Sequence, residues 1–158
     1  MSLMRLAAVA ALLLVALSPA RAQRCGPFNA SVPPPAPRTD AAAVSVFHRI
    51  NAQVKTQPYR VLFLGDSLVE RWNEPRWGAR AVWAADMAPR GVLNAGVSGD
   101  RTEHLRWRLD HGNLDGPKPR GVVLLIGTND LGHGRSPQEA AEGIRQTLIR
   151  LRQKLPDT

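Results

Sequence analysis

Cysteine is almost absent from this sequence, which has a single one, Cys25, in 158 residues. One thiol excludes an internal disulfide framework and a zinc site built from several cysteines. Lysine is scarce too: Arg dominates the 21 Lys and Arg residues, and the formal net charge is +8. Acidic residues interrupt this excess along the chain, so it lacks the basic run typical of a nucleic-acid-binding patch. We therefore expect no nucleic-acid partner.

Long hydrophobic runs are also missing, apart from Leu6–Leu17 near the N-terminus. This run is shorter than the roughly 20 residues that span a bilayer. Arg5 precedes it and Ala20-Arg21-Ala22, a small-x-small pattern, follows it, so residues 1–22 are predicted to be a cleaved signal peptide. The alternative is an uncleaved anchor. Cleavage predicts an exported protein, periplasmic or secreted, without a stable membrane span.

Residues 23–38 are rich in proline, which predicts an extended lead-in rather than a part of the core. Cys25 invites a lipoprotein interpretation, but the preceding Gln23-Arg24 does not fit a lipid-attachment box, and a spare thiol is the simpler account. Asn29-Ala30-Ser31 is a glycosylation sequon only in a host that glycosylates. The remaining residues, 39–158, have the length and composition of one globular domain.

Three continuous apolar runs predict strands, at residues 61–64, 92–93 and 122–126. None of them alternates polar with apolar residues. Continuous apolar strands are typical of a parallel sheet that helices cover on both faces. We expect the strand order 2-1-3.

Helical patterns alternate with these strands, at about 40–57, from Ser67 with an interruption near Pro75, at about 101–110 and at 136–155. In the last, Ser136 and Glu139 form a predicted capping box. Its predicted buried stripe consists of Ile144, Leu148, Leu151 and Leu155. Strand followed by helix three times predicts the α/β class: a three-layer α/β/α, flavodoxin-like, doubly wound parallel sheet.

Polar and small residues follow each predicted strand: Gly65-Asp66-Ser67 after the first, 94–100 after the second and Gly127-Thr128-Asn129-Asp130 after the third. Reactive groups collect beyond the carboxyl ends of the strands in an open parallel sheet, so these three sets are expected on one rim. Ser67, Gly99 and Asn129 are separated by 32 and 30 residues, about one strand–helix unit each.

This rim suits acyl transfer. Ser67 lies where a strand turns into a helix and offers a hydroxyl nucleophile, and the tetrahedral intermediate of an ester needs donors aimed at its oxyanion. The candidate donors are the Ser67 N–H, the Gly99 N–H and the Asn129 side-chain amide. Asp66 and Asp130, which flank the site, are interpreted as turn and loop organisers rather than as an acid/base pair.

The same segments resemble the GDSL, or SGNH, hydrolases. Residues 61–68 resemble the first sequence block of that family, 94–102 the second and 127–130 the third. Residues 105–109, 112–114 and Pro119 are similar to the branch that contains the α subunits of brain-type platelet-activating-factor acetylhydrolase. The resemblance implies Ser67 as nucleophile, an oxyanion hole of Ser67, Gly99 and Asn129, a small-molecule, lipid or carbohydrate ester as substrate, and no metal or organic cofactor.

One block of that family has no counterpart here. The family's fourth signature is an Asp-x-x-His pair near the C-terminus, which supplies the base and its orienting carboxylate, and no such pair lies beyond the third block of this sequence. We therefore expect a sheet that is incomplete at its C-terminal side, with 39–158 as a partial SGNH hydrolase domain and the third strand as an open edge. His133 and His104 are the alternative bases, although neither has an obvious orienting carboxylate.

The sequence is compatible with three functions. The first is a serine ester hydrolase whose catalytic His and Asp are missing from the sequence. The second is a non-catalytic binding protein that keeps the crevice, and the third is an inactive fragment or truncated gene product.

Overall fold

The computed structural model describes residues 30–77 and 79–158. The predicted signal peptide, Cys25 and Asn29 of the sequon lie outside the described residues. Within them, no helix combines the length and the apolar character that crossing a membrane requires.

Three parallel strands form the sheet: β1 (Val61–Gly65), β2 (Val92–Gly96) and β3 (Gly121–Leu125). Their order is β2-β1-β3, which confirms the prediction. β1 is the central strand, and its Phe63 lies opposite Asn94 of β2 and Val123 of β3. Because the strands are parallel and in register, their carboxyl ends meet at one rim of the sheet.

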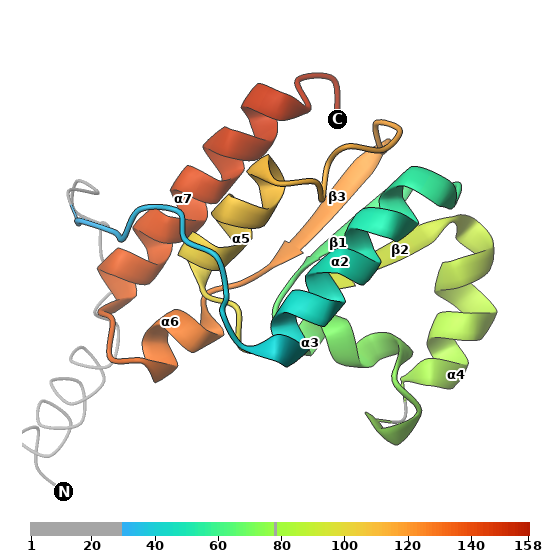
Figure 1. The fold of residues 1–158 in the computed structure, drawn as a ribbon, viewed down its shortest axis with the longest axis horizontal. Helices are drawn as coiled ribbons and strands as arrows, with labels where there is room; N and C mark the ends of the chain where they lie inside the picture. The colour runs from blue at the N-terminus through green and yellow to red at the C-terminus, as the bar shows by residue number, and fades with distance from the viewer. Residues whose placement is uncertain (1–29, 78) are drawn as a thin grey trace, which may run out of the picture.

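Helices cover both faces of this sheet, as an α/β fold requires. On one face lie the longer helices α2 (Ala41–Thr56), α5 (Thr102–Asp110) and α7 (Pro137–Lys154), side by side in Figure 1. The connection from β1 to β2 consists of short helical segments: α3 (Ser67–Glu70), η1 (Arg71–Asn73), η2 (Pro75–Trp77), α4 (Arg80–Val82), η3 (Trp83–Met87) and η4 (Ala88–Arg90). A further short helix, α6 (Thr128–Gly132), follows β3.

Alternate residues of β1 face these two layers. Leu62 and Leu64 are fully buried in the main core, together with apolar side chains of α2, α5 and α7. Phe63 points to the opposite face, where its ring meets Trp83 edge-on at a centroid distance of 5.7 Å. The central strand is therefore packed on both faces, as its continuous apolar run predicts.

The start of α7 agrees closely with the sequence. The Ser136 Oγ accepts from the Glu139 N–H at 3.2 Å, and the Glu139 carboxylate accepts from the Ser136 N–H at 2.8 Å. This is the predicted capping box, which satisfies two otherwise unpaired backbone donors.

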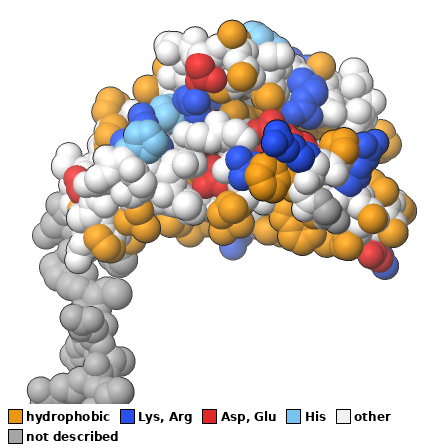
Figure 2. Space-filling model, turned by 90° about the horizontal axis from the view of Figure 1, so that it is seen from below, with side chains coloured by type: hydrophobic (Ala, Val, Ile, Leu, Met, Phe, Trp, Pro, Cys, Tyr) orange, Lys and Arg blue, Asp and Glu red, His pale blue; other side chains and the backbone are white. Residues whose placement is uncertain are grey.

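β3 departs from the expectation of two covered faces. Val123 and Leu125 keep 43% and 46% of their surface exposed. Within the described residues β3 pairs only with β1, so its outer edge is open, as the incomplete sheet predicts. Val123 shares a face with Phe63, opposite to α7, and hydrophobic side chains gather along the lower border of the molecule in Figure 2.

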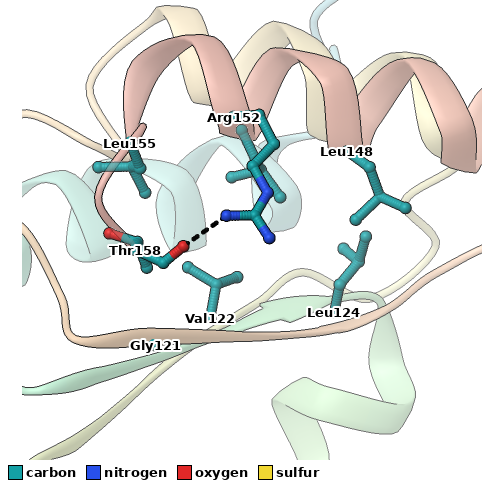
Figure 3. Close-up of a pocket in the computed structure, with 8 residues that line it drawn as sticks. Gly121, Val122, Leu124, Leu148, Arg152, Leu155 and Thr158 are labelled. Carbon is teal, nitrogen blue, oxygen red and sulfur yellow. Dashed lines mark hydrogen bonds between the residues drawn. The ribbon is translucent and has the colours of Figure 1, made fainter.

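Leu148 was expected in the buried stripe of α7 and is instead 48% exposed, so this part of the prediction is wrong. It lies across from Leu124 in an open groove of about 260 Å³ between β3 and α7 (Figure 3). Leu151 and Leu155 of the same stripe are buried. The difference has a simple cause: Leu148 faces the open edge of the sheet, where no described residue covers it.

Candidate active site

Ser67 is the first residue of α3, directly after β1. Asp66 forms the N-cap of this helix, and its Oδ1 accepts from the Leu68 N–H at 2.9 Å. This cap confirms Asp66 as a turn organiser and fixes the backbone on both sides of the half-buried Ser67.

Gly99 lies in a tight turn after β2. The Asp100 N–H donates to the Val97 carbonyl at 3.1 Å, which closes the turn, and Gly99 has a φ of +79°, a value that favours glycine. Gly96, at the end of β2, lets the chain approach α3, since a Cβ there would lie 2.2 Å from the Glu70 backbone nitrogen. The turn is therefore held close to the helix that carries Ser67.

Asn129 reaches this rim from α6, beyond the end of β3. Its Nδ2 donates to the Asp100 carbonyl at 2.9 Å and lies 3.4 Å from the Asp66 Oδ2. Asp66 and Asp100 are the sequence neighbours of Ser67 and Gly99. The structure thus brings all three predicted site residues to one end of the sheet, as their spacing predicts.

Two backbone donors at this rim have no partner within the described residues. Among residues 30–77 and 79–158, neither the Ser67 N–H nor the Gly99 N–H has a hydrogen-bond acceptor. The Asn129 amide already has partners, but the contact to Asp66, at 3.4 Å, is long. An oxyanion could compete for that amide hydrogen, because charge-assisted hydrogen bonds are shorter and stronger than neutral ones.

Asp130 is also an organiser, as predicted. It is fully buried, and its carboxylate accepts from the Thr102 N–H at 3.0 Å and from the Thr102 hydroxyl at 2.7 Å. Arg135 pairs with the same carboxylate. These contacts fasten the start of α6 to the start of α5. Burial raises the pKa of the other flanking carboxyl, Asp66, and the nearby Asp130 charge adds to this rise.

A buried ion pair beneath the Gly99 turn escaped the sequence analysis. The Asp100 carboxylate accepts from the Arg108 Nε at 2.7 Å, and both side chains are at least 97% buried. Arg108 also donates to the carbonyls of Ala95 and Gly65 at 3.2 and 3.3 Å. It therefore ties the ends of β2 and β1 together. The sequence shows only an Asp and an Arg eight residues apart, a pattern too common to indicate such a contact.

The histidines do not supply an evident base. In the described part of the chain, no histidine is hydrogen-bonded to Ser67. The His133 Nδ1 lies 2.8 Å from the Asn129 carbonyl, an acceptor, so that nitrogen carries the proton and Nε2 is the acceptor nitrogen of the ring. The His104 Nδ1 accepts from the Arg101 N–H at 3.1 Å and caps α5. His104 is thus a structural residue, and His133 has only a carbonyl to orient it.

His104 gives the fold a testable dependence on pH. Burial lowers the pKa of His104 from 6.5 to about 4. Between these two pH values the unfolded chain is protonated at His104 and the native chain is not, so the native chain loses stability as the pH falls. We expect His104 alone to lower the free energy of unfolding by about 2 kcal/mol between pH 7 and pH 4.5. Urea titrations across this range measure it. His104→Asn, which keeps an acceptor for the Arg101 N–H, should flatten the profile.

The exposed His48 provides the control for that experiment, and His48→Asn should retain the original profile. The neighbouring Glu103 does not interfere above pH 4.5. Its pKa is lowered to about 2, because hydrogen bonds from Arg135 and Arg101 outweigh the burial that opposes them, and its contribution is lost only as the pH falls from 4.5 toward 2. An unchanged slope in His104→Asn would contradict the assignment of the titration to His104.

Among the described residues, no group of three or more His, Cys, Asp or Glu side chains is arranged to hold a metal ion. The chemistry available from the described side chains at the rim is that of a hydroxyl, backbone amides, a side-chain amide and buried carboxylates.

Comparison with known proteins places this rim in a family. The sequence model of the GDSL-like lipase/acylhydrolase family matches residues 63–158. The α1 subunit of platelet-activating factor acetylhydrolase IB from Bos taurus is 33% identical over 117 residues, which is 74% of this chain and 47% of that protein. A Drosophila melanogaster homologue of the beta subunit is 34% identical over 113 residues, covering 72% of this chain and 47% of that protein.

Solved structures agree on the fold. A candidate platelet activating factor from Streptococcus pneumonia superimposes with a TM-score of 0.61 at 24% identity, over 74% of this chain and 51% of the other. The SGNH-hydrolase family esterase AlinE4 gives a TM-score of 0.50 at 28% identity, over 63% and 57%. The chain belongs to the GDSL-like lipase/acylhydrolase family, on the branch of the platelet-activating-factor acetylhydrolases. It spans about half the length of the curated relatives it matches.

Proposed function

We propose that this chain carries the nucleophile and the oxyanion hole of a serine ester hydrolase. Ser67 Oγ attacks the ester carbonyl, and the Ser67 N–H, the Gly99 N–H and the Asn129 amide receive the oxyanion. The observation that carries this proposal is the position of the Asn129 Nδ2, 2.9 Å from the carbonyl of Asp100 and 3.4 Å from the carboxylate of Asp66. The names of its relatives favour an acyl ester substrate, acetyl esters included.

The described residues do not place a general base beside Ser67. A serine hydroxyl is a weak nucleophile near neutral pH until a base removes its proton. None of the described histidines contacts Ser67. We propose that an Asp-x-x-His segment outside residues 1–158 supplies the base and its orienting carboxylate.

A binding protein that retains the crevice without turnover is the second candidate, and this absence of a positioned histidine favours it. The two candidates differ in the reactivity of Ser67. A bound ligand alone leaves the hydroxyl unmodified, whereas a nucleophile beside an oxyanion hole forms a covalent adduct with an activated phosphonate.

We expect prolonged incubation with a fluorophosphonate at alkaline pH, where hydroxide from the solvent takes the place of a positioned base, to label the chain once, on the peptide that contains Ser67. The serine oxygen displaces fluoride from phosphorus and its proton leaves to solvent as the phosphonate ester forms. Intact-mass and peptide mass spectrometry locate the adduct. Ser67→Ala should abolish the label, and Ser45→Ala, at an exposed position on α2, should not change it. Equal labelling of Ser67→Ala and the unmodified chain would overturn the assignment of the nucleophile.

Export is a separate proposal, because the predicted signal peptide lies outside the described residues. Fused to alkaline phosphatase, which is active only after export, residues 1–30 should produce activity, since the apolar run and the Ala20-Arg21-Ala22 site direct translocation. Replacing Leu13 in that run by Arg should remove the activity. Cytoplasmic retention of the unmodified fusion would contradict an exported, periplasmic or secreted protein.

A further inference from the structure

The backbone of Ser98, the residue before Gly99, is held at its N–H and at its carbonyl by residues distant in sequence. The Ser98 N–H donates to the Glu70 carboxylate at 2.5 Å, from the end of α3. The Ser98 carbonyl accepts from the Arg38 Nη1 at 3.0 Å, from the segment before α2. With the Asn129 amide on the Asp100 carbonyl, the turn is clamped on both sides of Gly99.

Arg38 lies directly over Gly99. A Cβ built on Gly99 would be 2.8 Å from the Arg38 Nη1 and 3.2 Å from its Nη2, so the guanidinium covers one side of the turn. Its Nη1 is also 3.6 Å from the Asp100 Oδ1, a fully buried oxygen without a hydrogen bond in the described part of the chain. Arg38 thus touches the turn at the residues before and after Gly99 and rests against Gly99 itself.

Arg38 is itself fixed. Its Nη2 pairs with the Asp40 carboxylate at 2.6 Å, and Asp40 caps α2 through the Ala43 N–H at 3.0 Å. The cap bond, assisted by Arg38, lowers the pKa of Asp40, which keeps this partner charged at neutral pH. The lead-in ahead of Arg38 is docked too, because the Ala36 N–H donates to the Glu103 carbonyl at 3.3 Å. This part of the proline-rich segment therefore packs against the domain.

We propose that Arg38 is a positioning residue of the oxyanion hole, an inference that rests on the proposed function. Its two contacts with the turn orient the Gly99 peptide so that the N–H, which has no partner among the described residues, points to the rim. Arg38 acts through Gly99 and does not contact the substrate. The segment before α2 is in this way a part of the active-site structure.

Phenylboronic acid tests this role in the full chain, since it mimics the tetrahedral intermediate. The serine oxygen adds to boron, the proton leaves to solvent, and the resulting tetrahedral boronate anion places one of its hydroxyl oxygens in the hole. Removing one oxyanion donor costs about 10²–10³ in rate, so a misdirected Gly99 N–H should weaken boronate binding by about tenfold in Arg38→Met. Boron NMR of the tetrahedral species measures the affinity.

Two variants serve as controls. Arg90→Met removes a guanidinium from an exposed pair with Asp86, at 3.2 Å, and should bind boronate like the unmodified chain. Arg38→Lys keeps the charge and one donor, so it should recover part of the affinity. It should also shift the Gly99 amide resonance in glycine-labelled protein, which a stability defect elsewhere would not do, and this readout remains if Arg38→Met fails to fold.

The outcomes separate the two proposals. Absence of any adduct in the unmodified chain, or an equal affinity in Ser67→Ala, overturns the proposed function together with the role of Arg38. An adduct that depends on Ser67 but is bound equally by the unmodified chain and the Arg38 variants overturns only the role of Arg38. An unchanged Gly99 resonance in Arg38→Lys has the same consequence.

Discussion

Joining residues 30–158 to the segment that follows the matched region in the bovine relative is expected to raise the rate of p-nitrophenyl acetate hydrolysis by about 10²–10⁴-fold over that of the chain alone. The reason is the base. The described residues hold free donors at the rim but place no histidine on Ser67, and general-base catalysis accounts for a gain of this size. The open edge of β3 gives the added segment a strand to pair with.

The controls for this chimaera are single substitutions. Ser67→Ala should abolish the gain, and changing the His of the added Asp-x-x-His to Ala should return the rate to that of the chain alone. The residual activity of the chain itself reflects the oxyanion hole, which sustains roughly 10³–10⁴-fold catalysis over water when a triad member is missing. If the chain alone already matched the chimaera, another base, with His133 as the first candidate, would have to act.

Replacing Arg108 by Met is expected to lower the free energy of unfolding by about 3–5 kcal/mol. In the unmodified chain the Arg108 Nε lies 2.7 Å from the Asp100 carboxylate. The substitution leaves that carboxylate buried without this cation. It also removes the donors that join the ends of β1 and β2. Urea unfolding followed by circular dichroism measures the change. A loss of this size is a large share of the stability of an ordinary domain.

Arg150→Met is the matched control, because its guanidinium pairs with Asp110 at 2.6 Å where both side chains are partly exposed. This pair should contribute less than about 1 kcal/mol. The double variant Asp100→Asn with Arg108→Met should recover part of the stability, since it removes the stranded charge. A loss below about 1 kcal/mol in Arg108→Met would show that the buried pair does not organise the turn.

The fold was predictable to the extent that local patterns determine it. Continuous apolar runs identified all three strands, and the Ser136 capping box fixed the start of α7. Leu148 was misplaced because helical periodicity says which side a residue faces but not whether another element covers that side. The exposed Val123 has the same cause, since burial on the second face of β3 depends on neighbours that the described residues do not provide.

Some residues of the candidate site were predictable from the sequence, and others depend on how the helices pack. Ser67, Gly99 and Asn129 follow strand ends, so topology alone brings them to one rim. Arg38 and Glu70 act on the same turn through contacts that span 60 and 28 residues. No spacing rule connects such positions, because the contact depends on how α2 and α3 pack rather than on the order of residues. The proline-rich lead-in appeared to be peripheral for the same reason.

The most direct test of the central claim is a crystal structure of the chain after phosphonylation. The account predicts a phosphorus bonded to the Ser67 Oγ, with its free oxygen about 2.7–3.1 Å from the Ser67 N–H nitrogen, the Gly99 nitrogen and the Asn129 Nδ2. The Asn129 amide should then have left the Asp66 carboxylate. An adduct whose oxygen points to solvent, with Asn129 still 3.4 Å from Asp66, would contradict the oxyanion hole proposed for this chain.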